Sequence, residues 1–150
     1  MHDRYFDDFE IGERFASRGI TVSEGQILDF GLRYDPQPFH IDREAAAESP
    51  YGGLIASGFQ TLALAFRAFY DADVIKHCSL GSPGFDALRW LKPVRPGDTL
   101  RTEGVVKSLR ASKSQSDRGI LHMDYEVKIQ TGETVITFTA IHLLRRRPAT

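Results

Sequence analysis

The sequence predicts an α+β fold in which a curved antiparallel sheet wraps around one long central helix. The first half of the chain carries helical patterns, and the second half carries long strands joined by hairpins. Between them, residues 54–70 (LIASGFQTLALAFRAFY) have apolar side chains on every side and a single charge, a pattern that favours a helix buried all round. Such a helix needs a sheet to cover it. At 150 residues the chain is expected to form one domain over residues 1–150.

Three elements are expected in the first half: a strand over residues 14–22, a helix ending at Tyr34, and a short helix over residues 43–48. Ser23 and Gln26 have the spacing of a capping box, which marks the start of the first helix. The Asp35–Pro36 corner ends it, because proline keeps the residue before it out of the helical region. Asp42 is placed to cap the second helix.

Four strands are expected in the second half: residues 85–91, 99–109, 121–129 and 134–143. The third alternates without a break, apolar on odd numbers and polar on even numbers, so one face should be buried and the other wet. Residues 131–133 predict a tight hairpin, and a shift of the apolar phase near Ala140–Ile141 predicts a bulge. The edges of such a sheet offer a route to a dimer by pairing between two subunits.

Composition and charge argue against several function classes. The net charge is −1 with both signs interspersed, so no basic surface favours nucleic acid. Cys78 is the only cysteine, which leaves no internal disulfide and no thiolate metal cluster. The chain shows neither an uninterrupted apolar stretch long enough to span a bilayer nor an apolar signal core at its start. We therefore expect a soluble protein of the cytoplasm.

Residues 35–42 (DPQPFHID) place an acid, Asp35, and a base, His40, five residues apart. Pro36 and Pro38 restrict themselves and their neighbours, so the segment should be a stiff, extended or turned loop. Stiffness suits a catalytic pair, which has to be held in one geometry before substrate arrives. On spacing alone, a solvated acidic loop with a surface histidine stays equally open.

Gly58 stands within the predicted central helix, where glycine costs about 1 kcal/mol relative to alanine. One explanation is close packing against a strand. The other is that a side chain would keep a ligand away from a backbone N–H at the positive end of the helix dipole. A donor in that place can stabilise a developing oxyanion. The sequence leaves both explanations open.

Residues 30–42 (FGLRYDPQPFHID) and 45–59 (AAAESPYGGLIASGF) closely resemble the signature of MaoC-like dehydratases. That signature has aspartate and histidine in a D-x-N-P-x-H block, then a small-residue segment ending in A-H-G or A-S-G at a helix start. Residues 90–100 (WLKPVRPGDTL) are similar to a strand-turn-strand element of the same family. The resemblance covers nearly the whole chain. Gln37 stands in place of the usual asparagine, and Ser57 in place of a frequent histidine.

This resemblance implies a hot-dog fold and a lyase that reversibly hydrates a trans-2-enoyl thioester to an (R)-3-hydroxyacyl thioester. In such an enzyme Asp35 and His40 would activate water, and the Gly58 N–H would donate to the thioester oxygen. Further residues expected at the substrate are Gln37, Ser57 and Phe59. No metal or redox cofactor is expected, since coenzyme A or a carrier-protein pantetheine enters as part of the substrate. The resemblance also implies a homodimer or higher homo-oligomer and a place in fatty acid metabolism, without nucleic-acid or membrane partners.

Two alternatives remain beside the hydratase interpretation: an acyl-CoA thioesterase of the same fold, and a non-catalytic subunit that binds acyl chains. The Asp35/His40 pair argues against both, since thioesterases of this kind generally lack it and a structural copy has no need of it. His77 and Cys78 are adjacent, and neighbours on a strand point to opposite faces, so no thiol–base pair is expected. The late histidines at 122 and 142 are expected on the surface. Three basic residues could either meet coenzyme A phosphates or form a solvated rim: Arg89, Lys92 and Arg95.

Overall fold

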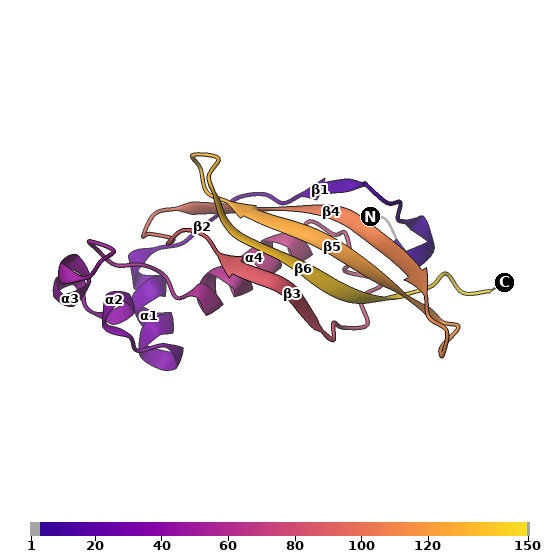
Figure 1. The fold of residues 1–150 in the computed structure, drawn as a ribbon, viewed down its shortest axis with the longest axis horizontal. Helices are drawn as coiled ribbons and strands as arrows, with labels where there is room; N and C mark the ends of the chain where they lie inside the picture. Colours follow the sequence, from indigo (N-terminus) through magenta and orange to yellow (C-terminus); the bar gives the residue numbers. More distant parts are fainter. Residues whose placement is uncertain (1–3, 150) are drawn as a thin grey trace.

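The computed structural model describes residues 4–149 (Figure 1). Residues 1–3, part of the segment expected to lack a signal core, and residue 150 lie outside this range. The strands are β1 (Arg14–Ala16), β2 (Ile20–Thr21), β3 (Gly84–Trp90), β4 (Thr99–Ala111), β5 (Arg118–Lys128) and β6 (Thr134–Arg145). The helices are η1 (Phe6–Asp8), α1 (Glu24–Tyr34), α2 (Pro38–Ile41), α3 (Arg43–Glu48) and α4 (Gly58–Asp71).

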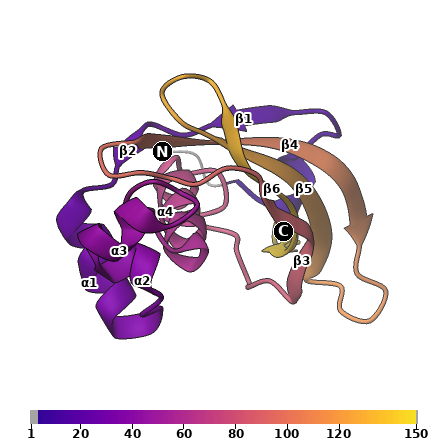
Figure 2. The ribbon, with the colours of Figure 1, turned by 60° about the vertical axis from the view of Figure 1, so that its left-hand side comes forward.

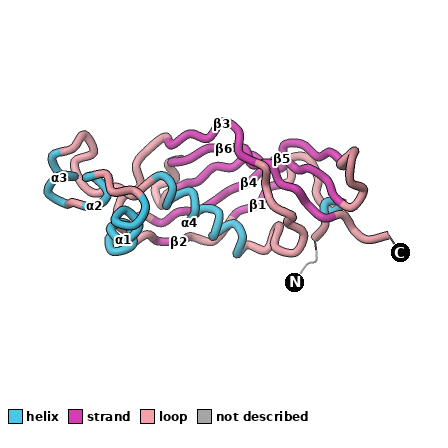
Figure 3. Tube along the Cα trace, turned by 90° about the horizontal axis from the view of Figure 1, so that it is seen from below, coloured by secondary structure: helices cyan, strands magenta, loops and turns pink. Residues whose placement is uncertain are grey.

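The strands form one antiparallel sheet in the order β1-β4-β5-β6-β3, with β2 also paired to β4. Within it, Tyr125 of β5 lies opposite Gly104 of β4 and Phe138 of β6. The alternation predicted for β5 is confirmed by its buried side chains: Leu121, Met123, Tyr125 and Val127. The sheet curves around α4, and α1, α2 and α3 gather beyond one end of it (Figures 2 and 3). The predicted α+β architecture is thus confirmed.

The central helix begins at Gly58, four residues later than the predicted start at Leu54. The segment before it is extended because its backbone forms hydrogen bonds with two other segments of the chain. The Ile55 N–H donates to the Phe39 carbonyl at 3.0 Å, and the Ala56 N–H donates to the Val94 carbonyl at 2.8 Å. These bonds tie the acid–base loop and the turn after β3 to the start of α4.

One face of α4 packs into the curved sheet. Phe69 is 1% exposed, and its ring meets Tyr125 edge-on with a centroid distance of 4.9 Å. The opposite face is open, with Phe59 64% and Phe66 47% exposed. The prediction of a helix buried all round is therefore wrong for the single chain, because one sheet layer covers only one side. None of the helices within residues 4–149 is both long and apolar enough to cross a membrane.

The predicted strand over 14–22 is two short strands, β1 and β2. Between them Ser17 leaves the ladder and exchanges two bonds with Thr102: its N–H donates to the Thr102 carbonyl, and its Oγ accepts from the Thr102 N–H, both at 2.9 Å. The capping box of α1 is confirmed, since Ser23 Oγ accepts from the Gln26 N–H at 3.1 Å. Asp42 caps α3 as expected, with Oδ1 accepting two backbone N–H bonds.

The bulge predicted at Ala140–Ile141 is wrong. These residues pair in regular register with β5, and the irregularity of that pairing lies between Val127 and Lys128. The shift of apolar phase has another cause. The even-numbered residues of β6 from 136 to 144 are all buried, and the one at position 142 is a histidine. His142 is 4% exposed and its Nε2 lies 2.7 Å from the Tyr125 hydroxyl, so its predicted surface position is also wrong.

Candidate active site

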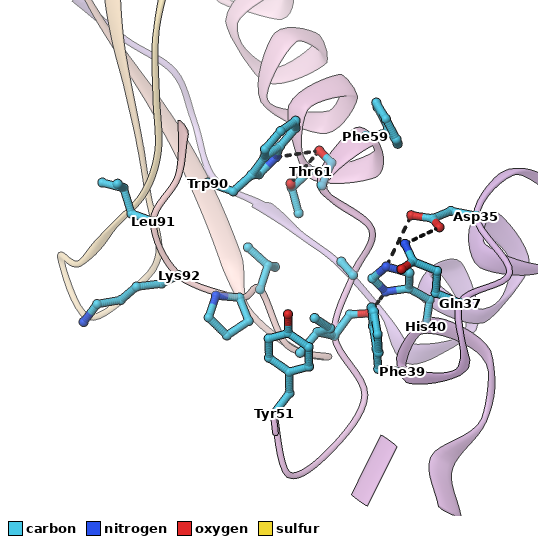
Figure 4. Close-up of a pocket in the computed structure, with 15 residues that line it drawn as sticks. Asp35, Gln37, Phe39, His40, Tyr51, Phe59, Thr61, Trp90, Leu91 and Lys92 are labelled. Carbon is cyan, nitrogen blue, oxygen red and sulfur yellow. Dashed lines mark hydrogen bonds and ion pairs between the residues drawn. The ribbon is translucent and has the colours of Figure 1, made fainter. Parts of the chain in front are cut away.

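A pocket of about 430 Å³ opens beside the start of α4 (Figure 4). Four segments form its walls: the loop and short helix after α1, the extended segment 54–57, the first turn of α4, and the end of β3 with its following turn. In Figure 4, Asp35 and His40 lie on one side of the pocket, and Trp90 and Leu91 lie on the other. The fold therefore gathers residues that are more than fifty positions apart in the sequence.

Asp35 is clamped by three neighbours. Its Oδ1 accepts a hydrogen bond from Gln37 Nε2 at 2.8 Å, and its Oδ2 accepts one from the Ser57 hydroxyl at 2.7 Å. His40 Nε2 lies 3.3 Å from the same Oδ2. Burial by itself would raise the pKa of Asp35, but the bonds from Ser57 and Gln37 and the charge of His40 outweigh it, so the pKa lies below its usual value. The carboxylate is held ionised and in one orientation.

His40 is buried at 4% exposure, and both of its ring nitrogens have partners. Its Nδ1 lies 2.7 Å from the Ile55 carbonyl oxygen, which can only accept, so Nδ1 carries a proton. Nε2 then faces the Asp35 carboxylate. The two groups lie 3.3 Å apart, close enough for a proton to pass between Nε2 and the carboxylate.

The acid–base segment is more ordered than a loop. Pro38 to Ile41 form one helical turn, α2, with proline at its first position, where its fixed φ suits a helix. A Cβ on Gly31 would lie 2.8 Å from Ile41 Cγ2 and 3.0 Å from the His40 carbonyl oxygen. The absence of a side chain at Gly31 therefore lets α2 pass close against α1, which positions His40.

Ser57 stands at the N-cap of α4, yet its side chain makes no capping bond. It is 1% exposed and donates to Asp35 instead. Ser57 is thus a support behind the carboxylate and does not line the pocket, which differs from its predicted place at the substrate. The first turn of α4 consequently has no side-chain cap over its free N–H groups.

Gly58 lines the pocket at the first position of α4. A Cβ there would lie 2.6 Å from the indole of Trp90, so close packing against a strand is one sufficient reason for glycine at this position. The Trp90 Nε1–H donates to the Gly58 carbonyl at 3.0 Å.

Two of the residues predicted at the substrate, Gln37 and Phe59, line the pocket. Four aromatic and hydroxyl residues that were not predicted at the substrate line the pocket as well: Phe39, Tyr51, Thr61 and Trp90. The signal for Trp90 was its position at the end of a predicted strand, three residues before the Pro93 to Gly97 turn.

The three basic residues differ in their surroundings. Lys92 lines the pocket and is paired with Glu133. The Arg95 guanidinium donates to the Tyr51 carbonyl at 2.6 Å, and that of Arg89 to the Leu88 carbonyl at 2.8 Å. All three remain exposed, and of the three, Lys92 alone reaches the pocket wall.

The remaining candidates lie away from the pocket. Cys78 is fully buried, and burial raises the pKa of its thiol to about 11. His77 pairs with Asp73, not with the thiol. Among residues 4–149, no three histidine, cysteine, aspartate or glutamate side chains are grouped so as to hold a metal ion.

Known proteins resemble the chain in sequence and in fold. The sequence model of the MaoC like domain family matches residues 8–129. The solved MaoC-like dehydratase of Rhodospirillum rubrum is 36% identical, with a TM-score of 0.90 over 97% of this chain and 99% of that chain. The mesaconyl-CoA hydratase of Cereibacter sphaeroides is 30% identical over 147 residues, which are 96% of this chain and 42% of that protein.

A Mycobacterium tuberculosis protein with a double hotdog fold has a TM-score of 0.77 and 22% identity, covering 98% of this chain and 46% of that chain. At this identity the likeness concerns the fold alone, and it confirms the hot-dog fold that the sequence resemblance implied. The family match spans most of the chain and includes the Asp35–Gly58 region. The chain therefore belongs to the MaoC-like domain family.

Proposed function

We propose that the protein is a hydratase that reversibly adds water to a trans-2-enoyl thioester and forms an (R)-3-hydroxyacyl thioester. The observation that carries the proposal is the 3.3 Å contact between Asp35 and His40 on the wall of a pocket that also contains the first residue of α4. Family membership supports this reaction class, since a relative named as a hydratase matches nearly the whole chain. Coenzyme A or a carrier pantetheine belongs to the substrate.

The contact between Asp35 and His40 suits this reaction. Asp35 takes one proton from water while the water oxygen bonds to the β-carbon, and His40 Nε2 gives its proton to the α-carbon. The proton then passes from Asp35 back to His40 across their contact, so the dyad ends as it began. Positioned acid–base groups of this kind typically contribute about 10²- to 10⁴-fold in rate.

The thioester oxygen becomes enolate-like when the β-carbon is attacked, and the Gly58 N–H is its proposed donor. Two features support this role. Gly58 lines the same pocket as the dyad, and no side-chain cap occupies the N-terminus of α4. The positive end of the helix dipole adds to the stabilisation of negative charge at this position.

A homodimer is part of the proposal, as is one domain over residues 1–150. β3 is an edge strand with an unpaired side, and the open face of α4 exposes Phe59 and Phe66. A second copy would cover both features. The mass in solution tests this: we expect a multiple of the 16.8 kDa chain mass. A monomer at assay concentrations would contradict it.

The activity is tested with crotonyl-CoA, whose enoyl absorbance disappears on hydration. We expect loss of absorbance with the wild type and none with Asp35→Asn or His40→Ala, while circular dichroism shows that both variants stay folded. Unchanged rates in either variant would overturn the mechanism. Branched and dicarboxylic enoyl-CoAs then define the acyl preference.

The alternatives give different results in the same assay. A thioesterase would release free coenzyme A from a saturated acyl-CoA, which a thiol-trapping reagent detects. A non-catalytic subunit would bind acyl-CoA without turning over any member of the panel. Either result would replace the hydratase proposal.

A further inference from the structure

Trp90 makes two contacts with Gly58, whose carbonyl also accepts a hydrogen bond from the Thr61 hydroxyl at 3.0 Å. Its indole lies where a Cβ of Gly58 would be, with ring atoms 2.6 Å from that position. Its Nε1–H donates to the Gly58 carbonyl at 3.0 Å. The indole is 46% exposed and forms part of the pocket wall opposite Asp35 and His40 (Figure 4).

A bulge in β3 places Trp90 on this side of the sheet. The pairing of β3 with β6 shifts between Asp86 and Arg89, where Ala87 has φ 53°, a left-handed conformation that is uncommon outside glycine. Because of the shift, Phe85 lies opposite Ala140 and Trp90 lies opposite Ile136.

Residues 140 and 136 are four apart on β6, so they share a face of the sheet, and directly paired residues point the same way. Phe85 and Trp90 are five apart, so in a regular strand they would point to opposite faces. The contact between the Phe85 and Phe138 rings, which are tilted at 43° with centroids 5.1 Å apart, is consistent with the shared face. The strained residue Ala87 therefore turns the Trp90 side chain toward α4.

The indole N–H is already used on the Gly58 carbonyl, so Trp90 has no donor left for a substrate. Its effect passes through Gly58, which lines the pocket at the first position of α4. We propose that Trp90 is a positioning residue: it fixes the first residue of α4 against the pocket and so sets where the Gly58 donor lies relative to the Asp35/His40 dyad. This inference rests on the proposed function.

Kinetics test the positioning role. Trp90→Phe keeps an aromatic ring beside Gly58 and removes the N–H, so we expect kcat to fall about fivefold, the factor for one neutral hydrogen bond, with KM nearly unchanged. Trp90→Ala removes ring and donor and should lower kcat by at least about tenfold. Phe85→Leu, an exposed aromatic on the same edge strand but outside the pocket, is the control and should keep kcat. Equal kcat in wild type and Trp90→Ala would overturn the proposal.

A stability cycle tests the contact independently of activity. Gly58→Ala should lower the Tm of the wild type, because its Cβ collides with the indole, and should lower that of Trp90→Ala clearly less. If Gly58→Ala lowers the Tm equally in the wild type and in Trp90→Ala, the proposed contact between Gly58 and the indole is wrong. If the cycle shows coupling while the wild type hydrates no enoyl-CoA, the contact stands and the proposed function fails, so the two failures are distinguishable.

Trp90 is the only tryptophan of the chain, so its fluorescence reports on the pocket wall alone. Titration with butyryl-CoA, which has no double bond to hydrate, should change the emission with the same Kd that calorimetry gives. Binding without any change in emission would contradict the position of Trp90 at the substrate.

Discussion

The Ser57 hydroxyl donates a hydrogen bond to Asp35 Oδ2 at 2.7 Å, although Ser57 stands where a helix-capping side chain belongs. Ser23 occupies the same position before α1 and does cap its helix. The two serines thus stand at equivalent N-cap positions, but the Ser23 hydroxyl caps its helix and the Ser57 hydroxyl bonds to Asp35. Before α4, the Ser57 hydroxyl donates to the Asp35 carboxylate, so no side chain caps the N-terminus of the helix beside the pocket.

Replacing Ser57 by alanine should change the pH dependence of catalysis. The bond from Ser57 helps to lower the pKa of Asp35, so its loss raises that pKa and carboxylate ionisation begins at higher pH. We expect the acid limb of the kcat/KM profile of Ser57→Ala to move upward, with kcat reduced about tenfold. Ser23→Ala is the matched control: it should lower the free energy of unfolding by about 1 kcal/mol and leave the profile in place. An unmoved acid limb in Ser57→Ala would count against this role.

Gln37 should matter less than Ser57, because its side chain is exposed and water can replace its bond to Asp35 Oδ1. We expect Gln37→Leu to shift the acid limb in the same direction as Ser57→Ala, with a loss of kcat of about threefold or less. Gln37→Asn, which restores the residue usual in the family signature, should retain most of the activity. A far larger loss in Gln37→Leu at unchanged KM would mean that Gln37 touches the reacting atoms.

Burial of His142 makes the fold sensitive to acid. Its pKa is lowered to about 4 from the ordinary 6.5, so below pH 6.5 the unfolded chain binds the proton and the folded chain resists it. Stability from this residue is complete above pH 6.5 and is lost as pH falls toward 4, by up to about 3 kcal/mol. Urea unfolding at several pH values measures this slope.

The double variant His142→Leu/Tyr125→Phe removes both polar partners together, so that no buried group is left unpaired. It should flatten the acid slope of the unfolding free energy. His122→Leu, a change at a half-buried position on β5, should leave the slope as it is. If the unfolding free energy of the double variant still falls with pH as steeply as that of the wild type, other groups cause the acid sensitivity.

Cys78 should be inert in the folded protein. It is fully buried, and the pKa of its thiol is raised to about 11, so little thiolate forms at neutral pH. A disulfide reagent such as Ellman's should react with it only at the rate of unfolding. Reaction at the rate of a free thiol in native conditions would show that the core opens around η1 and the end of β6.

Local patterns predicted much of the molecule correctly. The capping box at Ser23 and the cap at Asp42 are interactions between near neighbours, so spacing alone defines them. The alternation of β5 likewise reflects a single face buried by one neighbour layer. Asp35 and His40 became candidates through the proline-restricted loop together with the resemblance to the family signature, since the loop alone left a solvated surface segment equally open.

Other features depend on contacts between distant residues. The start of α4 at Gly58 is set by bonds from residues 55 and 56 to Phe39 and Val94, which no local pattern encodes. His142 is buried because β6 keeps its inward register and Tyr125 supplies a partner across the sheet. A hydropathy pattern counts a histidine as polar and therefore as exposed. It carries no information about a distant hydrogen-bond partner such as Tyr125, which allows the histidine to be buried.

By itself, the sequence determined the fold class and the likeness to the MaoC-like family, and it indicated Asp35 and His40 as the candidate acid and base. Each rests on residue types and their spacing along the chain. Only the tertiary structure decided that Ser57 supports Asp35, that the Trp90 indole lies against Gly58, and that the far face of α4 stays open. The physical reason is that hydrogen-bond partners and packing neighbours are chosen in space, across 22 and 32 positions of the chain for the first two pairs.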